Sequence, residues 1–164
     1  MTDTAPRELP LQELAEVIIR FAGDSGDGMQ LTGDQFTSIS AALGNDLATL
    51  PEFPAEIRAP QGTLAGVSAF QVRISDFAIT TPGDAPTVLV AMNPAALKAQ
   101  LHNVVQGGAI IINSDAFTER NLEKAGYESN PLEDGTLDGY RCYPVAMSQI
   151  TRDAVAVHGV KPRD

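Results

Sequence analysis

Cysteine, histidine, tryptophan and basic residues are scarce in this sequence. Its 164 residues include one Cys, two His and no Trp, and 11 Lys and Arg stand against 21 Asp and Glu, for a formal net charge of −10. A single cysteine excludes an internal disulfide framework, and also an iron–sulfur cluster held by this chain alone, since such a cluster needs about four protein ligands. The acidic balance argues against nucleic acid and anionic membranes as partners, because both bind clustered Lys and Arg.

Long apolar runs are also missing. The longest, residues 88–92, is far short of the ~20 residues that span a bilayer. The N-terminus carries Asp3, Glu8, Glu13 and Glu16 and lacks the basic and apolar regions of a signal peptide. We therefore expect a soluble, cytoplasmic protein.

Apolar runs and turn signals alternate along the chain. Runs typical of strands occupy residues 17–22, 66–74, 87–92, 109–112 and 140–145. Apolar spacing and cap residues predict helices over residues 29–43, 94–105 and 147–157, and a further helix start at residues 113–115. Such an alternation predicts a three-layer α/β fold of Rossmann-like type, with a mainly parallel sheet and helices on both faces.

The two ends of the chain look different from its middle. Residues 1–16 contain proline and acidic residues and are expected to form an extension, so the domain proper covers residues 17–164. No helix or strand is predicted after residue 160, which indicates a domain cut from a longer polypeptide.

Residues 48–62 contain three prolines. These exclude a regular helix or a central strand and favour an extended, semi-rigid loop. A loop of this length inside a compact domain is usually functional or disordered.

A glycine-rich turn, Gly-Asp-Ser-Gly-Asp-Gly at residues 23–28, joins the first strand to the first helix. Backbone N–H groups and the helix dipole can receive an anion at such a place. However, the glycine spacing differs from the dinucleotide fingerprint, and Asp24 and Asp27 would repel a diphosphate. These two side chains fit better as caps of the following helix or as partners of nearby backbone N–H groups. The glycines could also serve only to turn the chain tightly.

Two catalytic motifs partly match the same turn. Gly26-Asp27-Gly28 is similar to a thiamin-diphosphate signature, which we reject because Asn45 follows too soon. Gly23-Asp24-Ser25 resembles the nucleophile block of small lipases and esterases. Ser25 would then need His158 and Asp153 as its base and acid, with Asn93 as an oxyanion donor, but the spacing of that pair departs from the family pattern. A serine hydrolase therefore stays open as an alternative, as does a non-catalytic interaction module.

The remaining reactive side chains have structural interpretations. Cys142 is expected at a buried strand position, as a small core residue and not a nucleophile. His102 and His158 have no third ligand at metal spacing, which disfavours a zinc site.

Residues 20–33, Arg-Phe-Ala-Gly-Asp-Ser-Gly-Asp-Gly-Met-Gln-Leu-Thr-Gly, resemble the start of the gamma-type domain of 2-oxoacid:ferredoxin oxidoreductases, in the form fused to an alpha subunit. Residues 51–62 and 66–71 are similar to the same subunit, especially in its 2-oxoglutarate branch. The similarity covers nearly the whole chain.

The resemblance implies an enzyme complex that converts a 2-oxoacid, with 2-oxoglutarate favoured, and coenzyme A into an acyl-CoA and CO₂ while it reduces ferredoxin. Such enzymes use thiamin diphosphate, Mg²⁺ and [4Fe–4S] clusters, held mostly by a beta subunit and the remainder of the alpha subunit. The beta subunit and the remainder of the alpha subunit are therefore the implied partners of this chain, and ferredoxin is expected to bind the assembled complex. This chain is expected to hold no cofactor, metal or catalytic residue, and to be inactive alone.

In this family the gamma-type domain is a swivelling unit associated with coenzyme A access. We expect the glycine-rich turn and the proline-rich loop to face the rest of the enzyme. Arg58 is the best candidate for binding a CoA phosphate or a substrate carboxylate, because its guanidinium offers a bidentate fork and Arg73 is the only other cation between Phe21 and Leu97. A salt bridge from Arg58 to Glu52 or Glu56 is the competing interpretation. The candidate coenzyme A or interface residues are Gly23, Ser25, Gly26, Gly28, Arg58, Gln61, Gly62 and Thr63.

Overall fold

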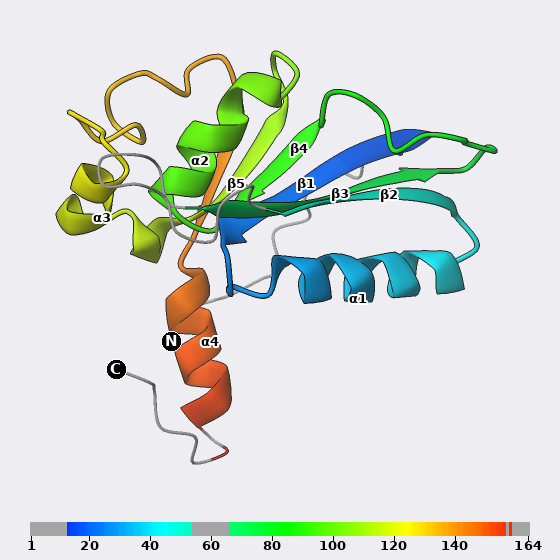
Figure 1. Cartoon of the computed structure of the whole chain (residues 1–164), viewed down its shortest axis with the longest axis horizontal. Coiled ribbons are helices and arrows are strands. Elements are labelled where there is room, and N and C mark those ends of the chain that lie inside the picture. Colours follow the sequence, from blue (N-terminus) through cyan, green and yellow to red (C-terminus); the bar gives the residue numbers. More distant parts are fainter. Residues whose placement is uncertain (1–12, 54–65, 157, 159–164) are drawn as a thin grey trace, which may run out of the picture.

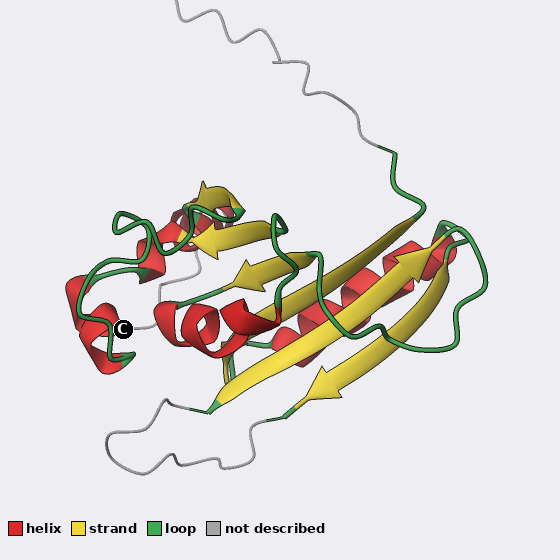
Figure 2. Ribbon diagram, turned by 90° about the horizontal axis from the view of Figure 1, so that it is seen from above, coloured by secondary structure: helices red, strands yellow, loops and turns green. Residues whose placement is uncertain are grey.

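A six-stranded sheet with helices on both faces forms the body of the protein (Figure 1). The computed structural model describes residues 13–53, 66–156 and 158. Seen from above, the strands lie side by side with α2 in front of them and α1 behind (Figure 2). No helix in these described ranges is long and apolar enough to cross a membrane. The elements in chain order are β1 Glu16–Asp24, α1 Met29–Ala42, β2 Asp46–Glu52, β3 Val67–Ser75, β4 Val88–Ala91, α2 Pro94–Gln100, the 3₁₀ turn η1 Leu101–Asn103, β5 Ala109–Asn113, the 3₁₀ turn η2 Ser114–Ala116, α3 Glu119–Lys124, β6 Arg141–Val145 and α4 Met147–Ala156.

The sheet is mostly parallel, with one strand reversed. Its strand order is β2-β3-β1-β4-β5-β6. The β1, β4, β5 and β6 strands pair in parallel, whereas β3 is antiparallel to both β1 and β2. The predicted three-layer α/β class with a mainly parallel sheet is therefore confirmed, and β3 is the exception within it.

β2 corrects the loop prediction. Residues 46–52 form a strand where the sequence predicts a loop from residue 48 onward. β2 is the outermost strand of the sheet, and its Pro51 lies opposite Phe70 of β3. Proline is tolerated there because one side of an outermost strand makes no ladder hydrogen bonds. The prolines thus exclude a central strand, as expected, but the loop prediction is wrong for residues 48–52.

The helices begin near their predicted caps, with one exception. The Asn93 Oδ1 atom accepts a hydrogen bond of 2.8 Å from an N–H in the first turn of α2, as its sequence position predicts. α2 is shorter than expected, because residues 101–103 continue it as a 3₁₀ turn. The start predicted at residues 113–115 yields only η2, and α3 begins instead after Thr118, which caps it.

Apolar side chains form one core on each face of the sheet, because successive side chains of a strand point to opposite faces. In β1, Phe21 joins the core between α1 and the sheet, and its neighbour Ala22 joins the core between α2 and the sheet. This explains why the strand runs are nearly continuous in apolar residues. The α2-side core is formed by Ala22, Ala69, Leu89, Ala91, Ala96, Leu97, Val104, Ile110, Ile112 and Leu137, and the α1-side core by Phe21, Met29, Phe70 and Val72.

α1 packs tightly on the sheet at Gly33. A Cβ atom at this position would overlap the ring of Phe70 in β3. The missing side chain therefore sets how closely α1 approaches β3.

Replacing Gly33 with Ala is expected to lower the free energy of unfolding by about 1–3 kcal/mol, because overpacking at Phe70 outweighs the gain of about 1 kcal/mol in helix propensity. Urea denaturation of the chain measures this change. Asp34→Ala, at the next and exposed position of α1, is the control and should shift stability by less than about 0.5 kcal/mol. A Gly33→Ala variant that is more stable than the wild type would contradict the close contact between α1 and Phe70.

Candidate functional site

The carboxyl ends of β1 and β4 lie side by side, and the chain leaves them toward opposite faces of the sheet. After β1 it passes through residues 23–28 into α1 below the sheet, and after β4 it passes through Asn93 into α2 above it (Figure 1). In open α/β sheets ligands bind at such a switch point, outside the carboxyl ends of the strands. The glycine-rich turn therefore occupies the position in the fold that most favours a site.

The turn is held by its own polar groups. The Asp27 carboxylate accepts a hydrogen bond of 2.9 Å from the Asp24 N–H, and the Asp27 N–H donates to the Asp24 carbonyl at 3.0 Å. The Ser25 N–H donates to the Gly66 carbonyl at 3.2 Å. The expected bonding of an Asp side chain to a nearby backbone N–H is thus confirmed. These three N–H groups already have acceptors, so they are not available to a phosphate.

The three candidate glycines of this turn differ in backbone conformation and exposure. Gly23 is the last residue but one of β1, and Gly26 is exposed with a φ of +115°. Gly28 is the N-cap of α1, with a φ of +77° that glycine adopts without strain. No side chain caps α1, so the expectation that one of the Asp residues caps this helix is wrong.

Asn93 joins the turn to α2. Its side-chain Nδ2 donates to Asp24 Oδ1 at 2.9 Å, while its Oδ1 atom caps the helix. A hollow of about 220 Å³ lies beside this link. Its lining residues are Asp24, Asn93, Pro94, Ala95, Asn121, Lys124 and Ala125.

The structure does not bring a hydrolase triad together. Among the described residues, no hydrogen bond joins Ser25 to His158 or His158 to Asp153. Asp153 accepts instead from Gln149 Nε2, at 2.7 Å within α4. Asn93, the oxyanion candidate, is occupied by Asp24 and by the helix cap.

A buried polar cluster around Arg20 is the feature that sequence reasoning missed. Arg20 lies in the middle of β1 and is 9% exposed. Its Nε donates to Gln71 Oε1 at 3.0 Å and its Nη1 donates to Gln100 Oε1 at 2.7 Å. Nη1 also lies 3.5 Å from a carboxylate oxygen of Glu52 at the end of β2. The available signal was a charged residue inside an apolar strand run, since a buried arginine needs partners.

Three other charged residues bear on the anion site predicted from the sequence, namely Arg73, Glu52 and Arg58. Arg73 pairs with Glu16 at 2.8 Å, near the amino end of β1 and away from the switch point. Glu52, an expected partner of Arg58, pairs with Arg20. Arg58 itself lies outside the described residues, as do Glu56, Gln61, Gly62 and Thr63.

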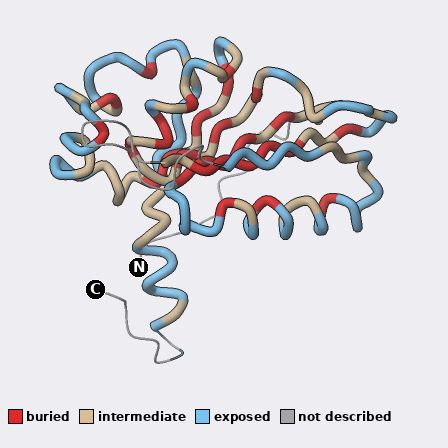
Figure 3. The backbone as a smooth tube through the Cα atoms, in the orientation of Figure 1, coloured by how far each residue is buried: buried red, intermediate tan, exposed pale blue. Residues whose placement is uncertain are grey.

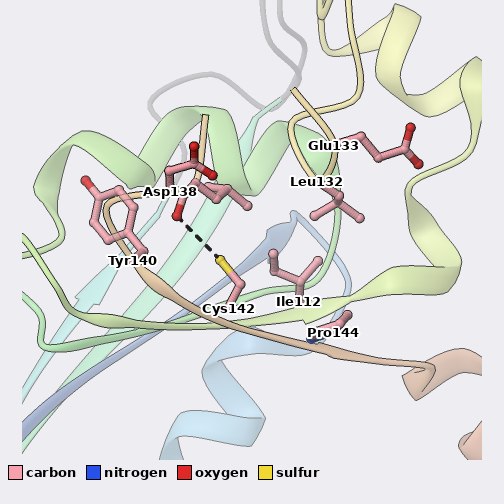
Figure 4. Close-up of a pocket in the computed structure, with 8 residues that line it drawn as sticks. Ile112, Leu132, Glu133, Asp138, Tyr140, Cys142 and Pro144 are labelled. Carbon is pink, nitrogen blue, oxygen red and sulfur yellow. Dashed lines mark hydrogen bonds between the residues drawn. The ribbon is translucent and has the colours of Figure 1, made fainter. Parts of the chain in front are cut away.

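Cys142 is exposed, so its expected place in the core is wrong. It lies on β6, the outermost strand opposite β2, where no further strand of the described chain covers it. Its thiol points into an open hollow of about 520 Å³ (Figure 4) and lies 4.0 Å from the Leu137 carbonyl oxygen. Partial desolvation in this hollow raises the pKa of the Cys142 thiol, and the charge of Asp138 raises it further.

Residues 18–161 match the model of the pyruvate ferredoxin/flavodoxin oxidoreductase family. The chain belongs to this family. 2-Oxoglutarate oxidoreductase subunit KorA of Mycobacterium tuberculosis is 61% identical over 153 residues, which are 93% of this chain and 23% of that relative. The resemblance inferred from residues 20–33, 51–62 and 66–71 is thereby confirmed.

Two solved structures of the oxidoreductase family share the fold. A 2-oxoglutarate:ferredoxin oxidoreductase from Magnetococcus marinus, with 2-oxoglutarate, coenzyme A and succinyl-CoA bound, aligns with a TM-score of 0.66 and 28% identity, over 86% of this chain and 22% of that chain. The gamma subunit of a keto/oxoacid ferredoxin oxidoreductase from Geobacter sulfurreducens aligns with a TM-score of 0.60 and 19% identity, over 85% of this chain and 66% of that chain. This oxidoreductase-family chain thus spans less than a quarter of the M. tuberculosis and M. marinus chains.

Replacing Arg20 with Ala in this oxidoreductase-family domain is expected to lower the free energy of unfolding by about 2 kcal/mol, because the buried Gln71 Oε1 loses its donor and Gln100 Oε1 keeps only the bond from Asn103 Nδ2. Glu52 is half exposed and adds little. Urea denaturation measures the loss. Arg152→Ala on the exposed face of α4 is the matched control, and equal stability of the two variants would show that the cluster is not stabilising.

Alkylation of Cys142 by iodoacetamide is expected to have a pH midpoint above the value of about 8.5 for free cysteine, since the raised pKa keeps the thiol protonated to higher pH. The chain has one cysteine, so the rate reports this thiol alone. Asp138→Asn should lower the midpoint without restoring it fully, because desolvation is the larger cause. Glu133→Gln, which alters another carboxylate of the hollow, is the control, and a wild-type midpoint at or below 8.5 would refute the assignment.

Proposed function

We propose that this domain serves a 2-oxoacid:ferredoxin oxidoreductase, with 2-oxoglutarate as the favoured substrate. The observation that carries the proposal is the 61% identity to a 2-oxoglutarate oxidoreductase subunit along 93% of the chain. The enzyme would oxidatively decarboxylate the 2-oxoacid, transfer the acyl group to coenzyme A and pass the electrons to ferredoxin.

Residues 17–164 would contribute a surface to this enzyme and not its redox chemistry. One cysteine cannot ligate an iron–sulfur cluster, and the turn that partly matches a thiamin-diphosphate signature lacks the later Asn. Thiamin diphosphate, Mg²⁺ and the [4Fe–4S] clusters are therefore assigned to the beta subunit and to the remainder of an alpha-type polypeptide, which are the proposed partners.

The carboxyl ends of β1 and β4 would face that body and the coenzyme A. Their position at the switch point supports this orientation. Gly23, Ser25, Gly26 and Gly28 would shape a contact surface, since the N–H groups of Asp24, Ser25 and Asp27 in this turn already have acceptors within the domain. Anion binding would fall to Arg58, assisted by Gln61, Gly62 and Thr63.

In the assembled enzyme, Arg58→Ala is expected to raise KM for coenzyme A by about tenfold, since a hydrogen bond to a charged group contributes on the order of 1.5 kcal/mol. Steady-state reduction of a ferredoxin or viologen acceptor measures it. Arg120→Ala, at an exposed position of α3, should leave the constant unchanged. If Arg58→Ala alters neither KM for coenzyme A nor that for 2-oxoglutarate, Arg58 has no binding role.

A further inference from the structure

The side of α1 that faces away from the sheet carries large aliphatic residues. Leu31 and Ile39 in α1, and Leu43 at the C-cap directly after it, are 62%, 65% and 78% exposed. Together with Gln35 they follow one another at intervals of four residues, so each side chain lies next to the one before it along the helix surface. We name these three aliphatic residues the α1 ridge. The buried turns of the same helix face the sheet and the exposed turns face away from it (Figure 3).

The α1 ridge lies on a helix with almost no charge. Asp34 is the only charged residue among the 14 of α1, although 20% of the whole chain is charged. The exposed hydroxyl of Ser38 donates to the Asp34 carbonyl at 2.8 Å, so this donor is satisfied without water. A helix that faces water normally carries charges on its outer side, whereas the centres of interfaces are depleted in them.

α4 also carries an exposed aliphatic residue, but in a different setting. Its Ile150 is 58% exposed, close to the exposure of Ile39. Around it, however, Gln149 is hydrogen-bonded to both Asp153 and Arg152, so the surface is polar and charged. The two helices therefore share exposed aliphatic residues but differ in their surroundings.

We propose that the α1 ridge docks on the remainder of the oxidoreductase, against an apolar surface with a basic side chain opposite Asp34. The inference rests on the proposed function. Less than a quarter of each large relative aligns with this chain, so in those relatives most of the same polypeptide is available to cover such a surface. A second copy of this chain fits less well, because each copy carries a net charge of −10.

Docking through this ridge would also orient the candidate site. α1 begins at Met29, directly after Gly28 of the glycine-rich turn. Met29 is buried in the α1-side core, so the start of the helix, next to the turn, is anchored on the sheet. A contact that holds α1 against the enzyme body therefore sets the place of the turn relative to the coenzyme A.

Hydroxyl-radical footprinting of the assembled enzyme tests the contact directly, since it measures the solvent access of individual side chains. Leu31, Ile39 and Leu43 should be oxidised about fivefold more slowly than Ile150, because a docked ridge excludes water. Oxidation rates within about twofold of that of Ile150 would overturn the proposal, as would protection that disappears on dilution, which indicates a second copy.

Ile39→Lys and Ile150→Lys form a matched pair of variants. A lysine in the docked ridge would bury a charge, so Ile39→Lys should raise oxidation of Leu31 and Leu43 to the rate of Ile150 and raise KM for coenzyme A by about tenfold. Ile150→Lys should change neither quantity, and Ile39→Val should retain wild-type values. Continued protection of Met29 shows that the domain is still folded. If Ile39→Lys changes neither footprint nor KM, the contact is refuted.

The two proposals fail in distinguishable ways. If the wild-type enzyme turns over 2-oxoglutarate but the α1 ridge is oxidised as fast as Ile150, the docking surface is refuted and the proposed function stands. A protected ridge in a complex without 2-oxoacid activity would refute the function instead.

Discussion

Most of this structure depends on the pairing of β1 with β3 on one side and with β4 on the other. β3 pairs antiparallel along the whole of β1, and β4 pairs in parallel with residues 19–22 of β1. Since successive side chains of β1 point to opposite faces, the strand supplies Phe21 to one core and Ala22 to the other. The chain then leaves β1 below the sheet and β4 above it, so the same pairing creates the switch point (Figure 1).

The polar groups near that switch point are largely bonded to one another. Asp27 holds the turn, Asp24 accepts from Asn93, and Glu52 lies beside the buried Arg20. A turn stabilised in this way keeps its shape without a ligand. These internal bonds are consistent with the proposed division of labour, in which partner chains hold the cofactors.

The sequence predicted the buried strands well because their signal is local. Residues 17–22, 87–92 and 109–112 are covered on both faces, so their apolar runs are nearly continuous, and all three form strands. β2 was missed because an outermost strand needs fewer apolar residues and tolerates Pro51. Cys142 was misplaced for a related reason: β6 has the composition of a strand, but its position at the end of the sheet leaves it exposed.

By itself the sequence determined the fold class, the family resemblance and the place of the glycine-rich turn between a strand and a helix. These follow from side-chain type and spacing within short segments. Only the tertiary structure decided that Arg20 meets Gln71 and Gln100, that β3 runs opposite to its neighbours, and that the three aliphatic residues of the α1 ridge stay exposed. Such facts depend on which distant segments become neighbours, and a local pattern of residues does not carry that information.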